Sequence, residues 1–163
     1  MKQLLSLLLC LSIIVPSMAK KEQRKQNVFP DGTPISEWFL QTKVVHPDSL
    51  GKKYDLSDYG IESNPHIVQT QKIQKIIDEA AANGGGVIYI PEGIYKSGSL
   101  FFKQGTHLYL SKGATLLGSE NIMDFPLLMT RIEGEYCKYF GALINADGLD
   151  TFTISGKGTI DGN

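Results

Sequence analysis

The sequence predicts an all-β fold in which short strands stack as the successive coils of a parallel β-helix. A phrase of twelve residues occurs three times, beginning at Ile88, Leu108 and Phe152. Each copy has apolar residues at its first and third positions and a glycine at its eleventh, and the copies start 20 and then 44 residues apart. Short alternating segments with glycine at the corners, repeated at this interval, are typical of stacked β-coils. Because one coil cannot bury its apolar face alone, neighbouring coils must cover each other.

Residues 1–19 are predicted to be a cleavable signal peptide. Lys2 precedes an apolar run from Leu4 to Val15, and Ser17 and Ala19 provide small residues for cleavage. The run is shorter than the roughly 20 apolar residues that cross a bilayer. Lipid attachment at the cysteine within the run is the weaker alternative, because a leucine stands where a small residue is needed. We therefore expect export to the periplasm or the cell exterior, with no membrane contact after cleavage.

Residues 20–60 are expected to form an N-terminal extension. The segment is dense in proline, glycine and aspartate, which favour turns, and a short strand is predicted at Tyr54–Tyr59. The aromatic pair Trp38 and Phe39 is interpreted as a hydrophobic anchor in preference to a platform for sugar rings.

Residues 61–163 are expected to hold a capping helix and the first coils of a β-helix domain that is truncated at its C-terminus. The helix is predicted at Gln69–Ala82, where apolar residues recur at helical spacing and Gly84–Gly86 follow as a stop signal. A cap is needed because a bare coil end exposes core side chains and unpaired strand edges. A partner-binding helix is the alternative. The last phrase breaks off at Asp161–Asn163, so we expect the first part of a larger protein.

The composition excludes several classes of partner. The net charge is −1 and no basic stripe is present, which argues against nucleic acid. The residues His46, His66 and His107 lack the spacing of metal ligands, so neither a metal site nor another cofactor is predicted.

Cys137 is the single cysteine beyond the signal peptide, and we expect it to be a small buried apolar residue.

No catalytic residue is predicted in this chain. Glycosidic hydrolysis needs two carboxyl groups that flank one bond. On stacked coils such a pair would come from acidic residues in register on adjacent strands, which lie about 4.8 Å apart. The phrase alignment places Leu117 and Ser97 beside Asp161, so no column of carboxylates is expected.

The repeat is interrupted between about Asn121 and Gly141, where we expect an inserted loop on the binding face. Arg131 and Glu133 are the candidate substrate-binding residues of this insertion. The planar fork of an arginine suits both oxygens of a sugar carboxylate. An ion pair between these two side chains that holds the loop shut is the alternative.

Six motifs follow one another in a characteristic order: Tyr54–Gly60, Ile73–Asp78, Gly84–Gly93, Gly98–Leu100, Thr130–Gly134 and Ser155–Gly162. Together they resemble the N-terminal part of glycoside hydrolase family 28, the polygalacturonase-type pectinases. The resemblance extends over nearly all of the chain from about Phe29. The ordered set that includes the last two motifs is more specific than the glycine-rich element, which several β-helix families share.

The resemblance implies a right-handed parallel β-helix and the hydrolysis of α-linked galacturonide bonds of pectin, with inversion and without metal. It also implies that the catalytic aspartates lie on later coils, so that the full-length parent is the enzyme and this chain alone is inactive. The expected partner is a pectic polysaccharide or oligogalacturonide, and the full-length protein is expected to be a monomer. A β-helix polysaccharide lyase and a non-catalytic glycan-binding adhesion or tail-spike module are the alternatives.

Overall fold

A computed structural model of the chain describes residues 27–40 and 45–163, which fall into two separate units. In the first unit, Val28 forms an isolated antiparallel bridge with Pro34, and a 3-10 helix, η1, follows at Glu37–Leu40. The Trp38 ring packs edge-on against Phe39 and is 69% exposed, so within this unit the aromatic pair is not buried as an anchor would be. The predicted signal peptide lies outside the described residues.

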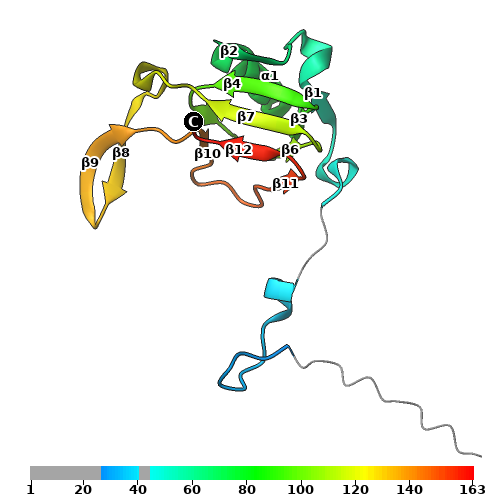
Figure 1. Ribbon diagram of the computed structural model, residues 1–163, viewed down its shortest axis with the longest axis vertical. Helices are drawn as coiled ribbons and strands as arrows, with labels where there is room; N and C mark the ends of the chain where they lie inside the picture. The colour runs from blue at the N-terminus through cyan, green and yellow to red at the C-terminus, as the bar shows by residue number, and fades with distance from the viewer. Residues whose placement is uncertain (1–26, 41–44) are drawn as a thin grey trace, which may run out of the picture. The chain divides into compact units, whose positions relative to one another are not determined.

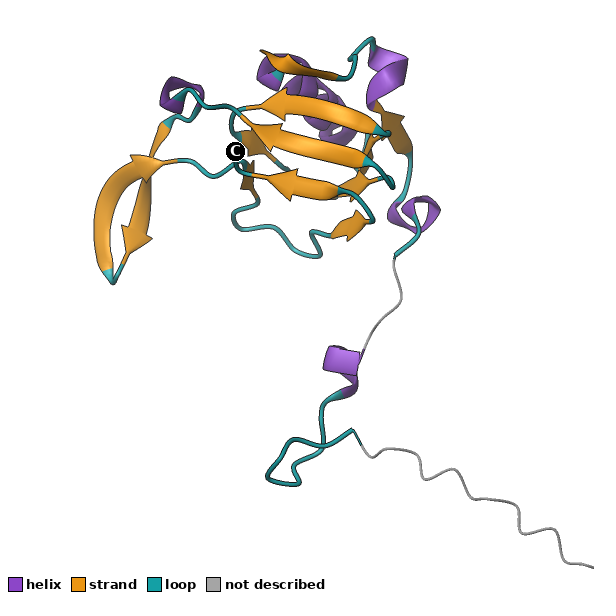
Figure 2. Ribbon diagram, in the orientation of Figure 1, coloured by secondary structure: helices purple, strands orange, loops and turns teal. Residues whose placement is uncertain are grey.

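The second unit consists of short parallel strands with one α-helix beside them (Figures 1 and 2). One sheet has the order β1-β3-β6-β11, with bounds Lys53–Asp55, Gly86–Ile90, Thr106–Leu110 and Ile154–Gly156. A second has the order β12-β7-β4-β2, with bounds Thr159–Asp161, Ala114–Gly118, Gly93–Ser97 and Asn64–Val68. A third pairs β10 (Ile144–Asn145) with β5 (Leu100–Phe101).

The chain visits these three sheets in turn, so each circuit is one coil of a parallel β-helix. Apolar side chains from successive coils lie directly above one another inside the stack: Ile88 is opposite Leu108, and Leu108 is opposite Ile154. Tyr95 and Leu116 form a second buried pair in the adjoining sheet. The predicted fold class is thus confirmed, because alternate residues of each strand point inward and stack.

The register corrects the gapless alignment of the three phrases. Ile154, not Phe152, lies opposite Leu108, and Lys96, not Ser97, shares a column with Leu117 and Asp161. The reason is that the corner between consecutive strands of a coil varies in length. Counted between paired positions, the corner from β6 to β7 is one residue longer than that from β3 to β4 and two residues longer than that from β11 to β12. A one-residue change at a corner shifts the following strand relative to its neighbour.

The helix α1 spans Thr70–Ala82 and confirms the predicted capping helix. Its buried residues, which include Ile73 and Ile77, join the core of the stack. The Gln74 amide docks it to β5, donating to the Phe101 carbonyl at 2.9 Å and accepting from the Phe101 amide at 2.8 Å. A side-chain amide placed in this way continues the strand ladder, so the helix covers backbone as well as apolar side chains.

Residues that were expected in the N-terminal extension belong to this second unit. β1 pairs in parallel with β3, and Tyr54 and Leu56 are buried in the core. The 3-10 helix η3 (Leu56–Tyr59) follows β1, so the strand is shorter than predicted. Another 3-10 helix, η2, precedes it at Pro47–Leu50.

The interruption of the repeat is an ordered hairpin instead of a loop. After the 3-10 helix η4 (Ile122–Asp124), β8 (Leu127–Ile132) pairs in antiparallel fashion with β9 (Glu135–Phe140). These two strands form a sheet of their own that stands away from the stacked coils (Figure 1). Cys137 lies on β9 and is only half-buried, contrary to the prediction, because within the described residues β8 and β9 form a two-stranded sheet outside the stacked coils.

Among the described residues, no helix has both the length and the apolar character that crossing a membrane would require.

Candidate functional site

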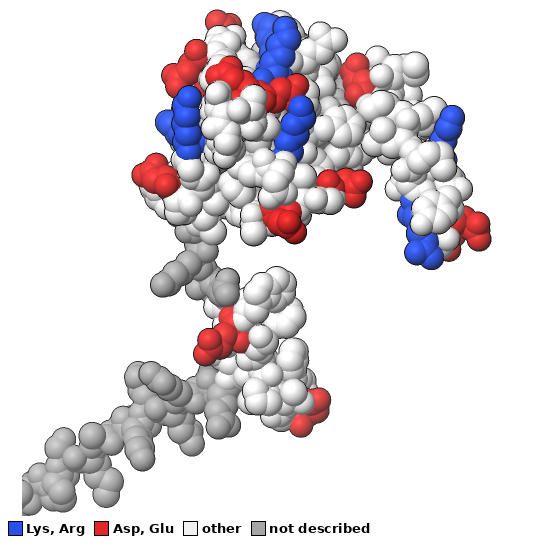
Figure 3. All heavy atoms as spheres, turned by 180° about the vertical axis from the view of Figure 1, so that it is seen from behind, with Lys and Arg blue, Asp and Glu red and all other residues white. Residues whose placement is uncertain are grey.

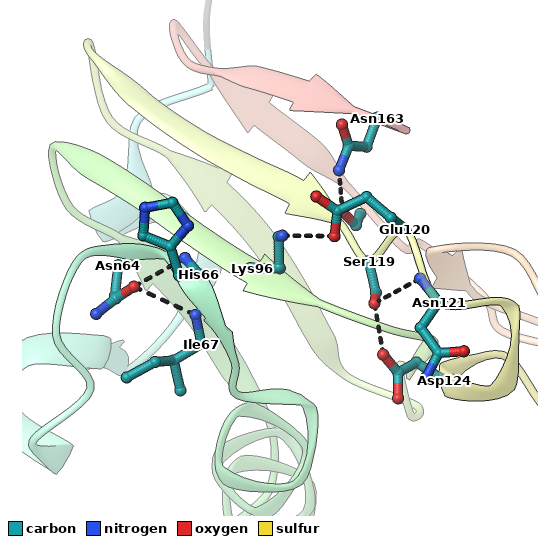
Figure 4. Close-up of polar contacts among 10 residues, drawn as sticks. Asn64, His66, Ile67, Lys96, Ser119, Glu120, Asn121, Asp124 and Asn163 are labelled. Carbon is teal, nitrogen blue, oxygen red and sulfur yellow. Dashed lines mark hydrogen bonds and ion pairs between the residues drawn. The ribbon is translucent and has the colours of Figure 1, made fainter.

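A polar cluster lies at the end of the sheet β12-β7-β4-β2 (Figure 4). It consists of Lys96, Ser119, Glu120, Asn121, Asp124 and Asn163. Lys96, Leu117 and Asp161 form one column across β4, β7 and β12. Because they alternate with the buried residues Tyr95 and Leu116, these three side chains lie on the outer face of the sheet. The cluster thus joins the outward-facing Lys96 of β4 to residues 119–121, which form the turn after β7.

Lys96 and Glu120 form the central contact of this polar cluster. The Lys96 Nζ lies 2.6 Å from the Glu120 Oε2, and the two side chains are 6% and 68% exposed. The lysine stem is thus covered while the carboxylate meets solvent. The hydrogen bond from Lys96 is the main cause that lowers the pKa of Glu120 to about 2, so the carboxylate is charged at neutral pH.

The turn after β7 is held by hydrogen bonds between its own residues. The Ser119 hydroxyl donates to the Asp124 carboxylate and accepts from the Asn121 amide. The Asn163 side-chain amide donates to the Gly118 carbonyl at 3.2 Å and so links the turn to the chain after β12. The turn is fixed from both sides, which positions the Glu120 carboxylate.

A second candidate site is a hollow of about 850 Å³ between the hairpin and the β5–β10 edge. Its walls combine aromatic rings with polar side chains, among them Phe101, Tyr139, Asn145 and Asp147. Mixed apolar and hydrogen-bonding walls are the usual lining of sites for small or extended ligands.

The structure places the two predicted substrate-binding residues at the far end of the hairpin. Arg131 lines the hollow, and its Nε donates to the Gly134 carbonyl at 3.0 Å. Glu133 is exposed and occupies the two-residue turn. No ion pair between the two side chains is found among the described residues. The alternative of a loop held shut by that pair is therefore not supported.

The sequence analysis missed the pair of Lys96 and Glu120. The residues are 24 positions apart, and they meet only because one coil brings β4 beside the end of β7. One sequence signal points to Lys96, because it is a lysine at a position where the second phrase has a leucine. The neighbour of Lys96 on the next coil, Leu117, becomes known only from the strand register.

Within residues 27–40 and 45–163, no group of three or more His, Cys, Asp or Glu side chains is arranged to hold a metal ion.

Two curated relatives match most of the chain. It is 33% identical over 146 residues to an exo-poly-α-D-galacturonosidase of Dickeya chrysanthemi, a match that covers 85% of this chain and 24% of the relative. It is 37% identical over 128 residues to the plasmin and fibronectin-binding protein A of Streptococcus pneumoniae, covering 76% of this chain and 17% of the relative. The chain therefore matches only about a quarter of the first relative and less of the second.

Solved structures show the same fold. A family 28 exopolygalacturonase of Yersinia enterocolitica is 33% identical with a TM-score of 0.60, over 69% of this chain and 21% of that one. A hyperthermoactive exopolygalacturonase of Thermotoga maritima has a TM-score of 0.66 at 24% identity, over 78% of this chain and 28% of that one. The second supports the fold alone.

No protein-family model matches the chain. The family is supported instead by the sequence relative from Dickeya and the structural neighbour from Yersinia, both above 30% identity and both with an exopolygalacturonase name. Together with the stacked parallel strands, these similarities confirm the resemblance of the chain to glycoside hydrolase family 28 that was found in the sequence.

Proposed function

We propose that this chain is the N-terminal part of an exported hydrolase that cleaves the α-linked galacturonide bonds of pectin with inversion. The observation that carries the proposal is the parallel β-helix whose sequence is 33% identical to an exo-poly-α-D-galacturonosidase over 85% of the chain. The catalytic carboxylates belong, on this proposal, to further coils that continue the stack beyond β11 and β12. The chain by itself is then inactive.

The described coils contribute to substrate binding instead of bond cleavage. Arg131 is proposed to contact a sugar carboxylate, because its guanidinium reaches the hollow beside the hairpin. Glu133 is proposed to accept hydrogen bonds from sugar hydroxyls at the hairpin tip. The exposed Glu120 carboxylate, anchored by Lys96, offers the same kind of acceptor on the outer face of the coils.

We further propose exo action, in which short products are released from one chain end. The support is that the Dickeya relative and the Yersinia structure, both above 30% identity, are named as exo-acting enzymes. Products of one uniform small size from polygalacturonate would agree with exo action. A ladder of intermediate lengths at early times would contradict it and would leave the hydrolase proposal standing.

Incubation of the full-length protein with polygalacturonate tests the proposal, with reducing ends and ultraviolet absorbance followed together. A hydrolase raises the number of reducing ends without producing an unsaturated sugar. Reducing ends that rise in step with the absorbance of a new double bond would identify a lyase. A folded, intact protein that gives neither signal would overturn the enzyme assignment.

A non-catalytic adhesion module is the second candidate, because the Streptococcus relative is named for binding plasmin and fibronectin and is 37% identical. This candidate predicts binding of a glycan or a protein without turnover. It also predicts that the full-length sequence carries no cluster of aspartates on its later coils.

A further inference from the structure

The hairpin of β8 and β9 carries its charges on separate faces. In an antiparallel pair, residues directly opposite share a face, and successive residues alternate between faces. The printed register therefore defines one face, which we name the cationic face: Leu127, Met129, Arg131, Tyr136, Lys138 and Phe140. The opposite face consists of Leu128, Thr130, Ile132, Glu135, Cys137 and Tyr139. The cationic face has two positive charges and no negative one.

The cationic face is open to solvent. Tyr136 and Met129 are 77% and 64% exposed, and Phe140 and Leu127 are exposed as well. Figure 3 shows the basic side chains of the hairpin at the surface. Single exposed apolar residues are normal on a protein surface, whereas a continuous patch of them marks an interaction site. The rings and apolar side chains gathered on this face of the hairpin therefore indicate a binding surface.

The two cations are available to a ligand. Arg131 lies over the Tyr136 ring, with its central carbon 6.0 Å from the ring centroid, and among the described residues only its Nε makes a hydrogen bond. The two terminal nitrogens therefore keep their donors for another acceptor. In the described part of the chain, neither Arg131 nor Lys138 takes part in an ion pair.

The charge of this face selects the kind of partner. A symmetric contact with a second copy of the chain would place equal surfaces together, and so would bring the arginine and lysine of one copy against those of the other. Like charges brought together at an interface are unfavourable. An anionic ligand meets no such repulsion and can also cover the aromatic rings. The face is therefore suited to an acidic chain with flat, partly apolar units.

We propose that the cationic face of the hairpin binds the uronate units of an acidic polysaccharide and holds the polymer beside the β-helix. Arg131 and Lys138 contact carboxylates, and Tyr136 and Phe140 pack against sugar rings. The choice of a uronate polymer rests on the proposed function. The binding surface itself rests on the register, exposure and charge of the hairpin.

The test compares the full-length protein with two variants of its hairpin for binding to polygalacturonate. The variant Arg131→Gln/Lys138→Gln removes both charges of the cationic face, and Glu135→Gln removes one charge from the opposite face of the same hairpin. We expect the double variant to bind about five- to tenfold more weakly and with a smaller dependence on salt, as two exposed ionic contacts are lost. Glu135→Gln should bind within about twofold of the wild type.

Binding and turnover are measured separately so that the two proposals can fail independently. Equal affinity of the double variant and the wild type, with both folded, would overturn the binding surface even if the enzyme hydrolyses pectin. Loss of affinity in a protein without hydrolytic activity would support the surface and overturn the proposed reaction. Equal competition by a fully esterified pectin or stronger competition by single-stranded DNA would contradict uronate recognition.

Discussion

Lys96 is a covered lysine that contacts one acidic partner. Its side chain is 6% exposed, and its Nζ is bound to the solvent-exposed Glu120 carboxylate. Removal of the acid leaves a covered ammonium without its partner, whereas Lys96→Met removes the charge and keeps the apolar stem. We expect Glu120→Gln to lower the free energy of unfolding, and Lys96→Met to lower it by less. Chemical denaturation of both variants checks this, and a larger loss for Lys96→Met would contradict it.

The same carboxylate predicts a pH dependence of stability. The hydrogen bond from Lys96 lowers the pKa of Glu120 from 4.5 to about 2 in the folded chain. A pKa that is lower in the folded state than in the unfolded state stabilises the protein above the unfolded value, and the contribution is lost as the pH falls towards the folded value. The difference in the free energy of unfolding between the wild type and Glu120→Gln should therefore shrink as the pH falls from about 5 to about 2. These limits follow from the unfolded pKa of 4.5 and the folded pKa of about 2. A difference that stays constant over that range would show that Lys96 does not control this titration.

Two adjacent glycines after α1 make a matched test of close packing. Both have positive φ angles, +91° at Gly84 and +102° at Gly85. A Cβ on Gly84 would meet no atom within 4 Å, whereas one on Gly85 would clash with the Gly105 carbonyl on the neighbouring coil. We expect Gly85→Ala to destabilise the protein by about 1–3 kcal/mol more than Gly84→Ala, because only the former adds overpacking to backbone strain. Equal thermal shifts for the two variants would contradict the stacking of these corners.

At the scale of elements, the hairpin turn offers a stabilising change. Glu133 and Gly134 both have positive φ angles, 52° and 96°, as the central residues of a type I′ turn do. Asparagine is preferred to glutamate at the first position, so Glu133→Asn should slow hydrogen exchange of the β8 and β9 amides. If Glu133 also contacts substrate, the same variant should bind oligogalacturonides more weakly although its hairpin is better ordered. Unchanged affinity would remove Glu133 from the proposed contacts.

The helix and the coils could be predicted because their signals are local. Ile73, Ile76 and Ile77 recur at helical spacing and are buried together, and the first strands of the phrases beginning at Ile88 and Leu108 stack as expected. The hairpin could not be predicted from its turn, since Glu133 occupies a position where asparagine or aspartate is the usual signal. The first strand of the third phrase was placed two residues out of register, although its second strand pairs as aligned, because corner length leaves no mark on an ungapped alignment.

The candidate sites were predictable only in part. Arg131 was identified from its chemistry, and the structure places it at a hollow. Its neighbours in space, Phe101 and Asn145, come from other coils and carry no signal that links them to the insertion. Contacts between coils depend on register, and register depends on every corner that precedes them.

At the scale of the whole molecule, the last described coil predicts the behaviour of the isolated chain. Ile154 and Ile160 continue columns that are buried higher in the stack, yet they are 47% and 43% exposed. Exposed apolar columns beside open strand edges favour association between chains. We expect residues 20–163 expressed alone to associate in a concentration-dependent manner, as measured by light scattering. A monomer with a sharp cooperative thermal transition would contradict this expectation.

The anomeric configuration of the first product, followed by NMR while the full-length protein cleaves an α-linked oligogalacturonide, tests the central claim most directly. The account predicts that the β-anomer appears first and that the α-anomer grows in later by mutarotation, as inverting hydrolysis requires. Initial release of the α-anomer, formation of an unsaturated sugar, or no cleavage by the folded protein would contradict it.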